Sequence, residues 1–154
     1  MNMSKIVRTS ADIILPFILV FGFYIIIHGH LTPGGGFQGG AVVATGIVLM
    51  IAANRYDGIK RVFKPETMKD VETLGLLFFI LTAFTAILLG SAFFFNWLVN
   101  GGIIFGDSVS YGSNAGFLNT AGLIPLMNIA VGIEVVGAMS VIVLYMISGI
   151  KEDL

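Results

Sequence analysis

The chain contains no cysteine, so it can form neither a disulfide nor a Cys-ligated metal or iron–sulfur site. Charged residues are also scarce, at 11% of 154 residues, whereas 56% of the residues are hydrophobic. This composition excludes an ordinary water-soluble domain. The first ten residues are too polar for a secretory signal peptide, so we expect the first apolar segment to be retained.

Four long apolar segments cover most of the chain, at about residues 11–28, 37–53, 71–95 and 121–147. A helix of about 18 residues spans ~27 Å, which is just enough for a hydrocarbon core of ~30 Å. The sequence therefore predicts an all-α integral membrane protein with four transmembrane helices. We expect residues 1–154 to form a single membrane domain, a small helix bundle.

Positive charge is missing from two of the three connections. The outer loops 29–36 and 96–120 contain no Lys or Arg, whereas the loop 54–70 and the two ends of the chain hold all eight: Lys5, Arg8, Arg55, Lys60, Arg61, Lys64, Lys69 and Lys151. Membrane proteins retain Lys and Arg on the cytoplasmic side. The distribution predicts a basic cytoplasmic loop at 54–70 and both termini in the cytoplasm.

Small residues recur every fourth position in two of the segments. Gly36, Gly40 and Ala44 follow this spacing in the second segment, and Thr82, Ala86 and Gly90 follow it in the third. Such spacing lets membrane helices approach one another closely. We expect these two helices to pack tightly against neighbours.

Glu134 is the one acidic residue at the middle of a predicted span. An ionisable group at the bilayer centre costs on the order of 3 kcal/mol on insertion scales, so it usually faces protein or water and carries protons or ions. The alternative is a protonated Glu that hydrogen-bonds to a neighbouring helix and only aids assembly. Glu134 is our main candidate for a proton or ion path.

Four further polar residues are weaker candidates for such a path. His28 and His30 stand at the outer edge of the first span, where they could relay protons or simply cap the helix. Asn128 lies six residues before Glu134, on another face, and could be a structural hydrogen-bonding residue. Asp12 is ordinarily explained as a helix-capping acid at the inner interface. Two His without a nearby third ligand predict no metal site.

The first outer turn is rich in glycine. Residues 34–39 fit the dinucleotide pattern G-x-G-x-x-G, but no strand precedes them and a membrane span follows, which excludes a nucleotide site. The turn and its flanks contain an unusual run of residues: Gly29, His30, Thr32, Pro33, Gly34, Gly35, Gly36, Phe37, Gly39 and Gly40. This run resembles the signature of the MnhB/MrpB family. Members of that family are small subunits of Mrp-type multisubunit cation/proton antiporters and of related hydrogenase and sulfur-reducing complexes.

This resemblance implies an accessory subunit in the cell membrane of a bacterium or archaeon. Its partners would be the lipid bilayer and other membrane subunits, including large antiporter-like ones, and the transported ions would be H⁺ and Na⁺. We expect no cofactor, no nucleic acid and no catalytic chemistry in this chain, although it could belong to a redox-driven ion pump. Two alternatives stay open: a small homo-oligomeric proton-coupled transporter, and a purely structural assembly subunit.

Overall fold

The computed structural model describes residues 3–54, 62–109, 111 and 116–152. Four helices lie in these ranges: α1 (Lys5–His28), α2 (Gly36–Ala53), α4 (Pro65–Leu88) and α5 (Ile124–Glu152). Each is long and apolar enough to cross a membrane. The predicted all-helical chain with four candidate spans is confirmed. The central part of the predicted basic loop, residues 55–61, lies outside the described residues.

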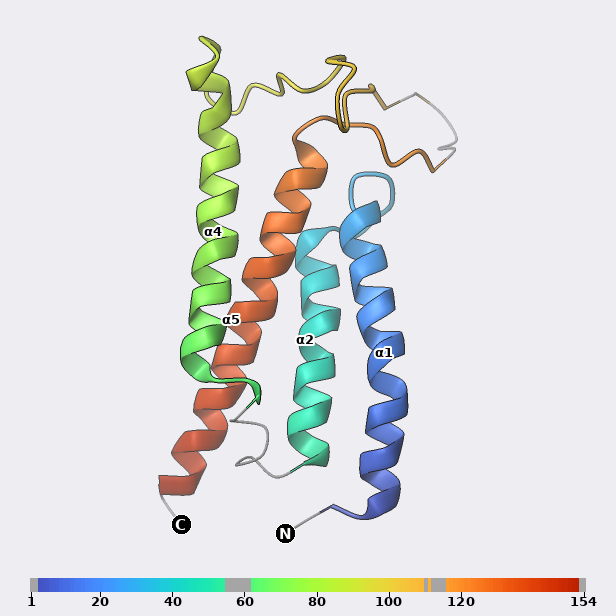
Figure 1. The fold of residues 1–154 in the computed structure, drawn as a ribbon, viewed down its shortest axis with the longest axis vertical. Coiled ribbons are helices and arrows are strands. Elements are labelled where there is room, and N and C mark those ends of the chain that lie inside the picture. The colour runs from blue at the N-terminus through green and yellow to red at the C-terminus, as the bar shows by residue number, and fades with distance from the viewer. Residues whose placement is uncertain (1–2, 55–61, 110, 112–115, 153–154) are drawn as a thin grey trace.

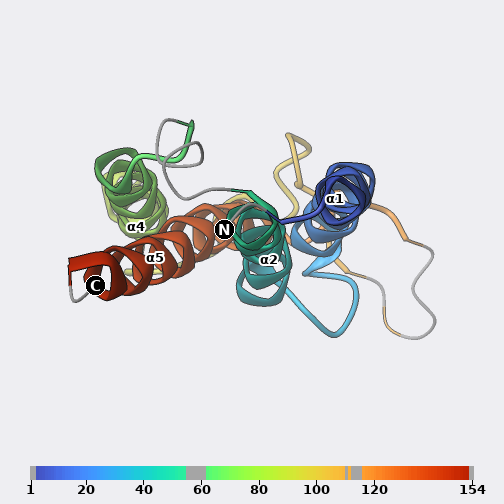
Figure 2. The same ribbon diagram turned by 90° about the horizontal axis from the view of Figure 1, so that it is seen from below.

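The four helices form a row (Figures 1 and 2). In the order of the row, α4 packs on α5, α5 on α2, and α2 on α1 (Figures 1 and 2). The start of α1 and the end of α5 lie at one end of this layer, here called the terminal side (Figure 1). The opposite end carries the connections α1–α2 and α4–α5 and is called the loop side. α1 also touches α5, where a Cβ at Gly132 would lie 2.7 Å from the Ile26 side chain. The rest of the two broad faces and the outer sides of α1 and α4 are open to lipid or to other proteins.

Glycines explain why α2 and α5 occupy the middle of the row. A Cβ at Gly39 would lie 2.8 Å from the Ile26 backbone nitrogen of α1, and one at Gly40 would lie 2.7 Å from the Gly132 carbonyl oxygen of α5. Such contacts require glycine, because real Cβ atoms do not approach so closely. The predicted close packing at Gly36, Gly40 and Ala44 is confirmed, since Ala44 is also buried.

On the terminal side, the helices extend beyond the apolar segments. The Ser4 hydroxyl accepts a hydrogen bond from the Val7 N–H at 3.3 Å, so α1 begins at Lys5 and not near residue 11. Pro65 occupies the first turn of α4, which starts six residues before the predicted span. Hydropathy marks only the part of a helix in the hydrocarbon, whereas caps and prolines determine where the helix begins.

On the loop side, two of the helices are shorter than predicted. α4 ends at Leu88, and Gly90 follows with a φ of 76°, so residues 89–95 do not continue the helix. Ala121 and Gly122 also have positive φ values, of 73° and 63°, and α5 begins only at Ile124. These left-handed residues interrupt helices within apolar sequence, where hydropathy carries no signal.

The connection between α4 and α5 is tied to the start of α5. The Asn96 side chain donates to the Ala121 carbonyl at 3.0 Å and accepts from the Leu123 N–H at 2.9 Å. Next to it, the Trp97 indole N–H donates to the Thr85 hydroxyl of α4 at 3.0 Å. These two neighbouring residues therefore connect the loop to both helices.

Candidate functional site

Glu134 lies on α5 against α4 and is half-buried. The closest approach of the two helices is at Gly75 of α4, where a Cβ would lie 2.7 Å from the Glu134 Cα and 2.8 Å from the Ala130 carbonyl oxygen. No hydrogen bond or ion pair reaches the Glu134 carboxylate from the residues that the structure describes. The structural alternative, a Glu134 hydrogen-bonded to a neighbouring helix, therefore finds no partner within the described part of this chain.

A second acid, Glu72, occupies the equivalent position on α4. A Cβ at Gly137 of α5 would lie 2.8 Å from the Glu72 Cα and 2.8 Å from the Met68 carbonyl oxygen. These contacts repeat those of Gly75 atom by atom. Each helix thus places a glycine on the backbone of the other helix's glutamate, and the two are related by a local two-fold axis.

This symmetry places the side chains of Glu72 and Glu134 on the same face of the layer. In a layer, the two-fold axis that relates two antiparallel neighbours is perpendicular to the layer, so equivalent side chains project from the same face. Gly75 lies at the same depth in the layer as Glu134. Because Glu72 is three residues from Gly75 on α4, the two glutamates are separated by about 4.5 Å along the helix axes. Glu72 and Glu134, here called the acid pair, are therefore one helical turn apart on one face.

The sequence reasoning missed Glu72, because hydropathy placed it at the very start of the third span. Because α4 starts at Pro65, Glu72 lies about two turns into the helix. A signal was present: both glutamates begin an E-x-x-G sequence, Glu72–Gly75 and Glu134–Gly137. Repetition of an acid with a glycine one turn later, on two spans, predicts this reciprocal packing.

Asn128 belongs to the loop side and not to the acid pair. It contacts the glycine turn, where a Cβ at Gly29 would lie 2.9 Å from its Nδ2 atom and one at Gly35 would lie 3.5 Å from its Oδ1 atom. The Nδ2 atom is buried and has no hydrogen-bond partner among the described residues. Asn128 therefore packs against the glycine turn from α5.

His28 ends α1, and its ring stacks on Tyr24 at 4.1 Å between centroids. Its carbonyl oxygen accepts from the N–H groups of Leu31 and Thr32, at 2.8 and 3.1 Å, and from the Thr32 hydroxyl at 3.2 Å. This part of the family motif therefore closes the end of the helix. The ring Nδ1 of His28 is buried and has no hydrogen-bond partner among the described residues.

His30 is covered by the long connection on the loop side, where Phe105 meets its ring edge-on at 6.4 Å. Burial lowers the pKa of His30, and the nearby His28 adds a smaller effect in the same direction. The backbone of Leu118 and Ile27 opposes the shift only in part. His30 is therefore held in the neutral form near pH 7.

The five predicted path residues lie at three levels of the layer. His28, His30 and Asn128 gather on the loop side, Glu134 lies at the crossing of α4 and α5, and Asp12 lies in a polar pocket on the terminal side. Of the five, Glu134 is the one that shares a face of the layer with a second acid, Glu72, about one helical turn away. Among the described residues, no three His, Asp or Glu side chains converge as metal ligands.

The fold and the site define a four-helix membrane protein of open form that exposes an acid pair. A family model for the domain related to the MnhB subunit of Na⁺/H⁺ antiporters matches residues 6–152. The chain belongs to the MnhB family.

Two relatives illustrate the range of this family. The chain is 33% identical over 123 residues to a Methanocaldococcus jannaschii protein, covering 79% of this chain and 44% of that one. It is also 33% identical over 88 residues to a Na⁺/H⁺ antiporter subunit of Bacillus subtilis, covering 57% and 61% of the two chains. The chain thus spans less than two thirds of each of these relatives.

A solved structure shares the architecture. A chain of the membrane-bound sulfane sulfur reductase, an archaeal respiratory membrane complex, matches with a TM-score of 0.72 and 34% sequence identity. The match covers 93% of this chain and 57% of that one. The family resemblance read from the glycine turn is therefore confirmed, and similar chains occur in a multisubunit membrane complex.

Proposed function

We propose that this chain is an accessory membrane subunit of an Mrp-type cation/proton antiporter module. The module is either a free-standing antiporter or the ion-translocating arm of a respiratory complex. The observation that carries the proposal is the open row of helices, with a face that exposes the acid pair. Family membership and the sulfane sulfur reductase match support it.

The acid pair is the part of the chain that we propose for ion translocation. Intramembrane carboxyl groups usually carry protons or ions, and two of them one turn apart offer more ligand oxygens than one. Six residues of α5, about 9 Å, separate Asn128 from Glu134, so the loop-side residues do not extend the pair into a path. Neighbouring subunits would have to complete it, with H⁺ and Na⁺ as the transported ions.

The proposed orientation places the terminal side in the cytoplasm. Lys5, Arg8, Lys64 and Lys69 all lie toward that side of the layer, and the described part of the loop side contains no Lys or Arg. This distribution follows the positive-inside rule. A reporter fused to the C-terminus that is active only in the cytoplasm tests the orientation. An inactive reporter would reverse it.

The role of the acid pair is tested in the complete assembly that contains this chain. We expect Glu134→Gln and Glu72→Gln each to slow Na⁺-driven proton movement in inverted vesicles by roughly tenfold or more. Glu66→Gln, an exposed acid in the first turn of the same α4, is the matched control and should retain the normal rate. Normal transport by both site variants in a fully assembled complex would reduce the chain to a structural subunit.

The homo-oligomeric transporter is the competing function, because a second copy could also cover the open face. Native mass after gentle detergent extraction separates the two. We expect migration with several different membrane subunits. A dimer of this chain alone, active after reconstitution, would contradict the accessory role.

A further inference from the structure

A polar pocket opens on the terminal side, between the first turns of α1 and the end of α2. Its lining residues are Lys5, Arg8, Thr9, Asp12 and Asn54. The four residues from α1 follow the spacing i, i+3, i+4 and i+7, which places them on one face of the helix. We propose that α1 binds a phospholipid here, with the lipid phosphate in this pocket.

The donors of the pocket suit a phosphate. Lys5 and Arg8 bring two positive charges, and Asn54 brings an amide. The backbone and side-chain N–H groups of Asn54 each donate to the Met50 carbonyl at 3.1 Å, which holds the residue in place. The Arg8 Nε atom is buried and has no hydrogen-bond partner in the described part of the chain. A guanidinium binds phosphate oxygens through paired N–H groups, and a buried donor without an acceptor is costly.

Asp12 is the exception in this set, because its carboxylate repels an anion. It lies one turn beyond Arg8, farther along α1 from the terminal side. The pocket keeps a net positive charge, with two cations against one carboxylate. Basic pockets of this kind between membrane helices bind anionic lipid headgroups.

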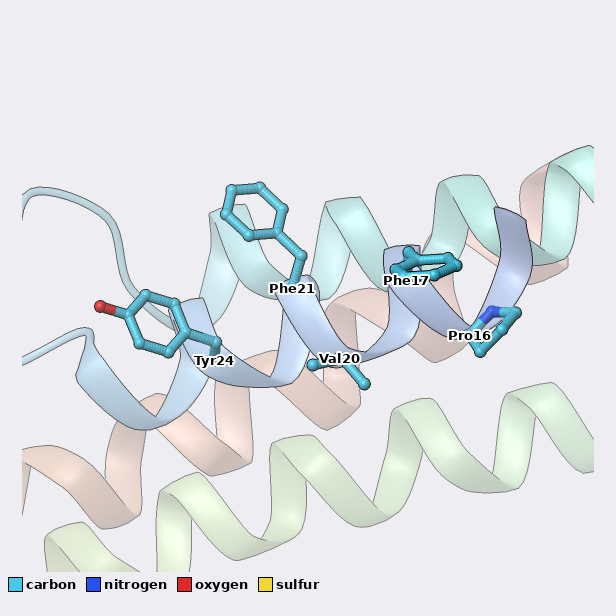
Figure 3. Close-up of a pocket in the computed structure, with 5 residues that line it drawn as sticks. All are labelled: Pro16, Phe17, Val20, Phe21 and Tyr24. Carbon is cyan, nitrogen blue, oxygen red and sulfur yellow. The ribbon is translucent and has the colours of Figure 1, made fainter. Parts of the chain in front are cut away.

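A separate apolar groove lies farther along the same helix and favours a lipid over a free phosphate as the ligand. The groove starts at Pro16, one turn after Asp12, and runs along α1 toward the loop side; it is lined by Pro16, Phe17, Val20, Phe21 and Tyr24 (Figure 3). Phe17 and Val20 are 72% and 69% exposed. A polar hollow near the helix end followed by an apolar groove along the helix matches an amphiphile with a phosphate head and an acyl chain.

The binding test uses the full chain, freed of lipid in a neutral detergent, with dioctanoyl phosphatidylglycerol as the probe and native mass spectrometry as the readout. Arg8→Gln should weaken binding about fivefold, as expected for one basic residue at a membrane surface. Lys64→Gln, which removes an exposed cation next to α4, is the matched control and should bind normally. Asp12→Asn should tighten binding, because it removes the carboxylate that repels the phosphate.

The apolar groove has its own variant. Val20→Trp should fill the groove and weaken lipid binding at least as much as Arg8→Gln does, whereas Leu77→Trp on the exposed surface of α4 should have no effect. Both positions are exposed, so neither substitution disturbs the packing between helices.

Several results would overturn the proposal. Equal losses in Arg8→Gln and Lys64→Gln would mean general charge attraction, and weaker binding by Asp12→Asn would exclude an anion in the pocket. Inorganic phosphate that displaces the lipid at similar concentrations would define a free-anion site. If Val20→Trp binds lipid like Leu77→Trp, the groove does not hold the acyl chain.

Discussion

The reciprocal contacts of Gly75 and Gly137 lead to a quantitative prediction about the stability of the α4–α5 pair. A Cβ at Gly75 would lie 2.7 Å from the Glu134 Cα, whereas ordinary van der Waals contact begins at 3.4 Å. Gly75→Ala therefore forces the two backbones apart by at least about 0.7 Å, since the Glu134 backbone nitrogen is closer still. A gap of this size loses a quarter to a half of the dispersion energy of the contacts it opens. We expect a loss of about 1–3 kcal/mol of stability, the usual cost of overpacking.

Gly137→Ala should cost about the same, because its contacts repeat those of Gly75. The double variant should be less destabilised than the sum of the two single variants, since one separation of the helices relieves both clashes. The measurement is unfolding in mixed micelles with increasing sodium dodecyl sulfate, followed by the fluorescence of Trp97, the only tryptophan. Because Trp97 is hydrogen-bonded to Thr85 of α4, its fluorescence reports the unfolding of this helix.

Gly149→Ala provides the matched control. Gly149 lies in the same α5, but nothing is found within 4 Å of the position of its Cβ. Alanine there should raise stability by up to about 1 kcal/mol, because glycine is a poor helix former. If Gly75→Ala behaved like Gly149→Ala, or if the double variant were fully additive, the reciprocal contact would not exist as described.

Two further predictions concern the loop side. His30 has a lowered pKa in the folded protein, so the unfolded chain binds more protons below about pH 6.5, and the stability should fall as the pH drops through that value. His30→Gln should remove this pH dependence when unfolding curves at pH 8 and pH 5.5 are compared. If the dependence is unchanged, another group causes it. Asn96→Ala should cost about 1–3 kcal/mol, because it leaves the Ala121 carbonyl and the Leu123 N–H without their partner. Ser91→Ala, at an exposed position of the same connection, should keep the stability within about 1 kcal/mol.

The sequence predicts the number and order of the helices well, because hydropathy reports directly on burial in lipid. It fails at the helix ends, where Ser4, Pro65 and Gly90 decide and the apolar signal does not change. The sequence also does not predict which helices pack against each other. Gly39 and Gly40 are equally small in the sequence, and only the structure shows that one meets α1 and the other meets α5.

The residues of the candidate site also fall into those that the sequence predicts and those that it does not. Glu134 could be found from its position in an apolar segment, and the glycine turn from its unusual composition. For Glu72 the sequence offers only the repeated E-x-x-G pattern. Hydropathy does not give its depth, because that depends on the register of α4 against α5, which is a property of two segments and not of one. The same holds for the polar pocket, where α1 and the end of α2 meet at Asn54.

The shape of the layer and the chemistry of the acid pair support the same interpretation of the proposed function. A closed bundle would have buried Glu72 and Glu134 among its own helices, where each carboxyl group would need a partner from this chain. The row instead leaves one face with two half-buried acids and no partner for the Glu134 carboxylate among the described residues. Exposing such a face to lipid costs free energy. Contact with another protein that supplies hydrogen-bond donors, cations or water offsets this cost. We therefore infer that a neighbouring subunit, and not lipid, covers the acid pair in the assembled complex.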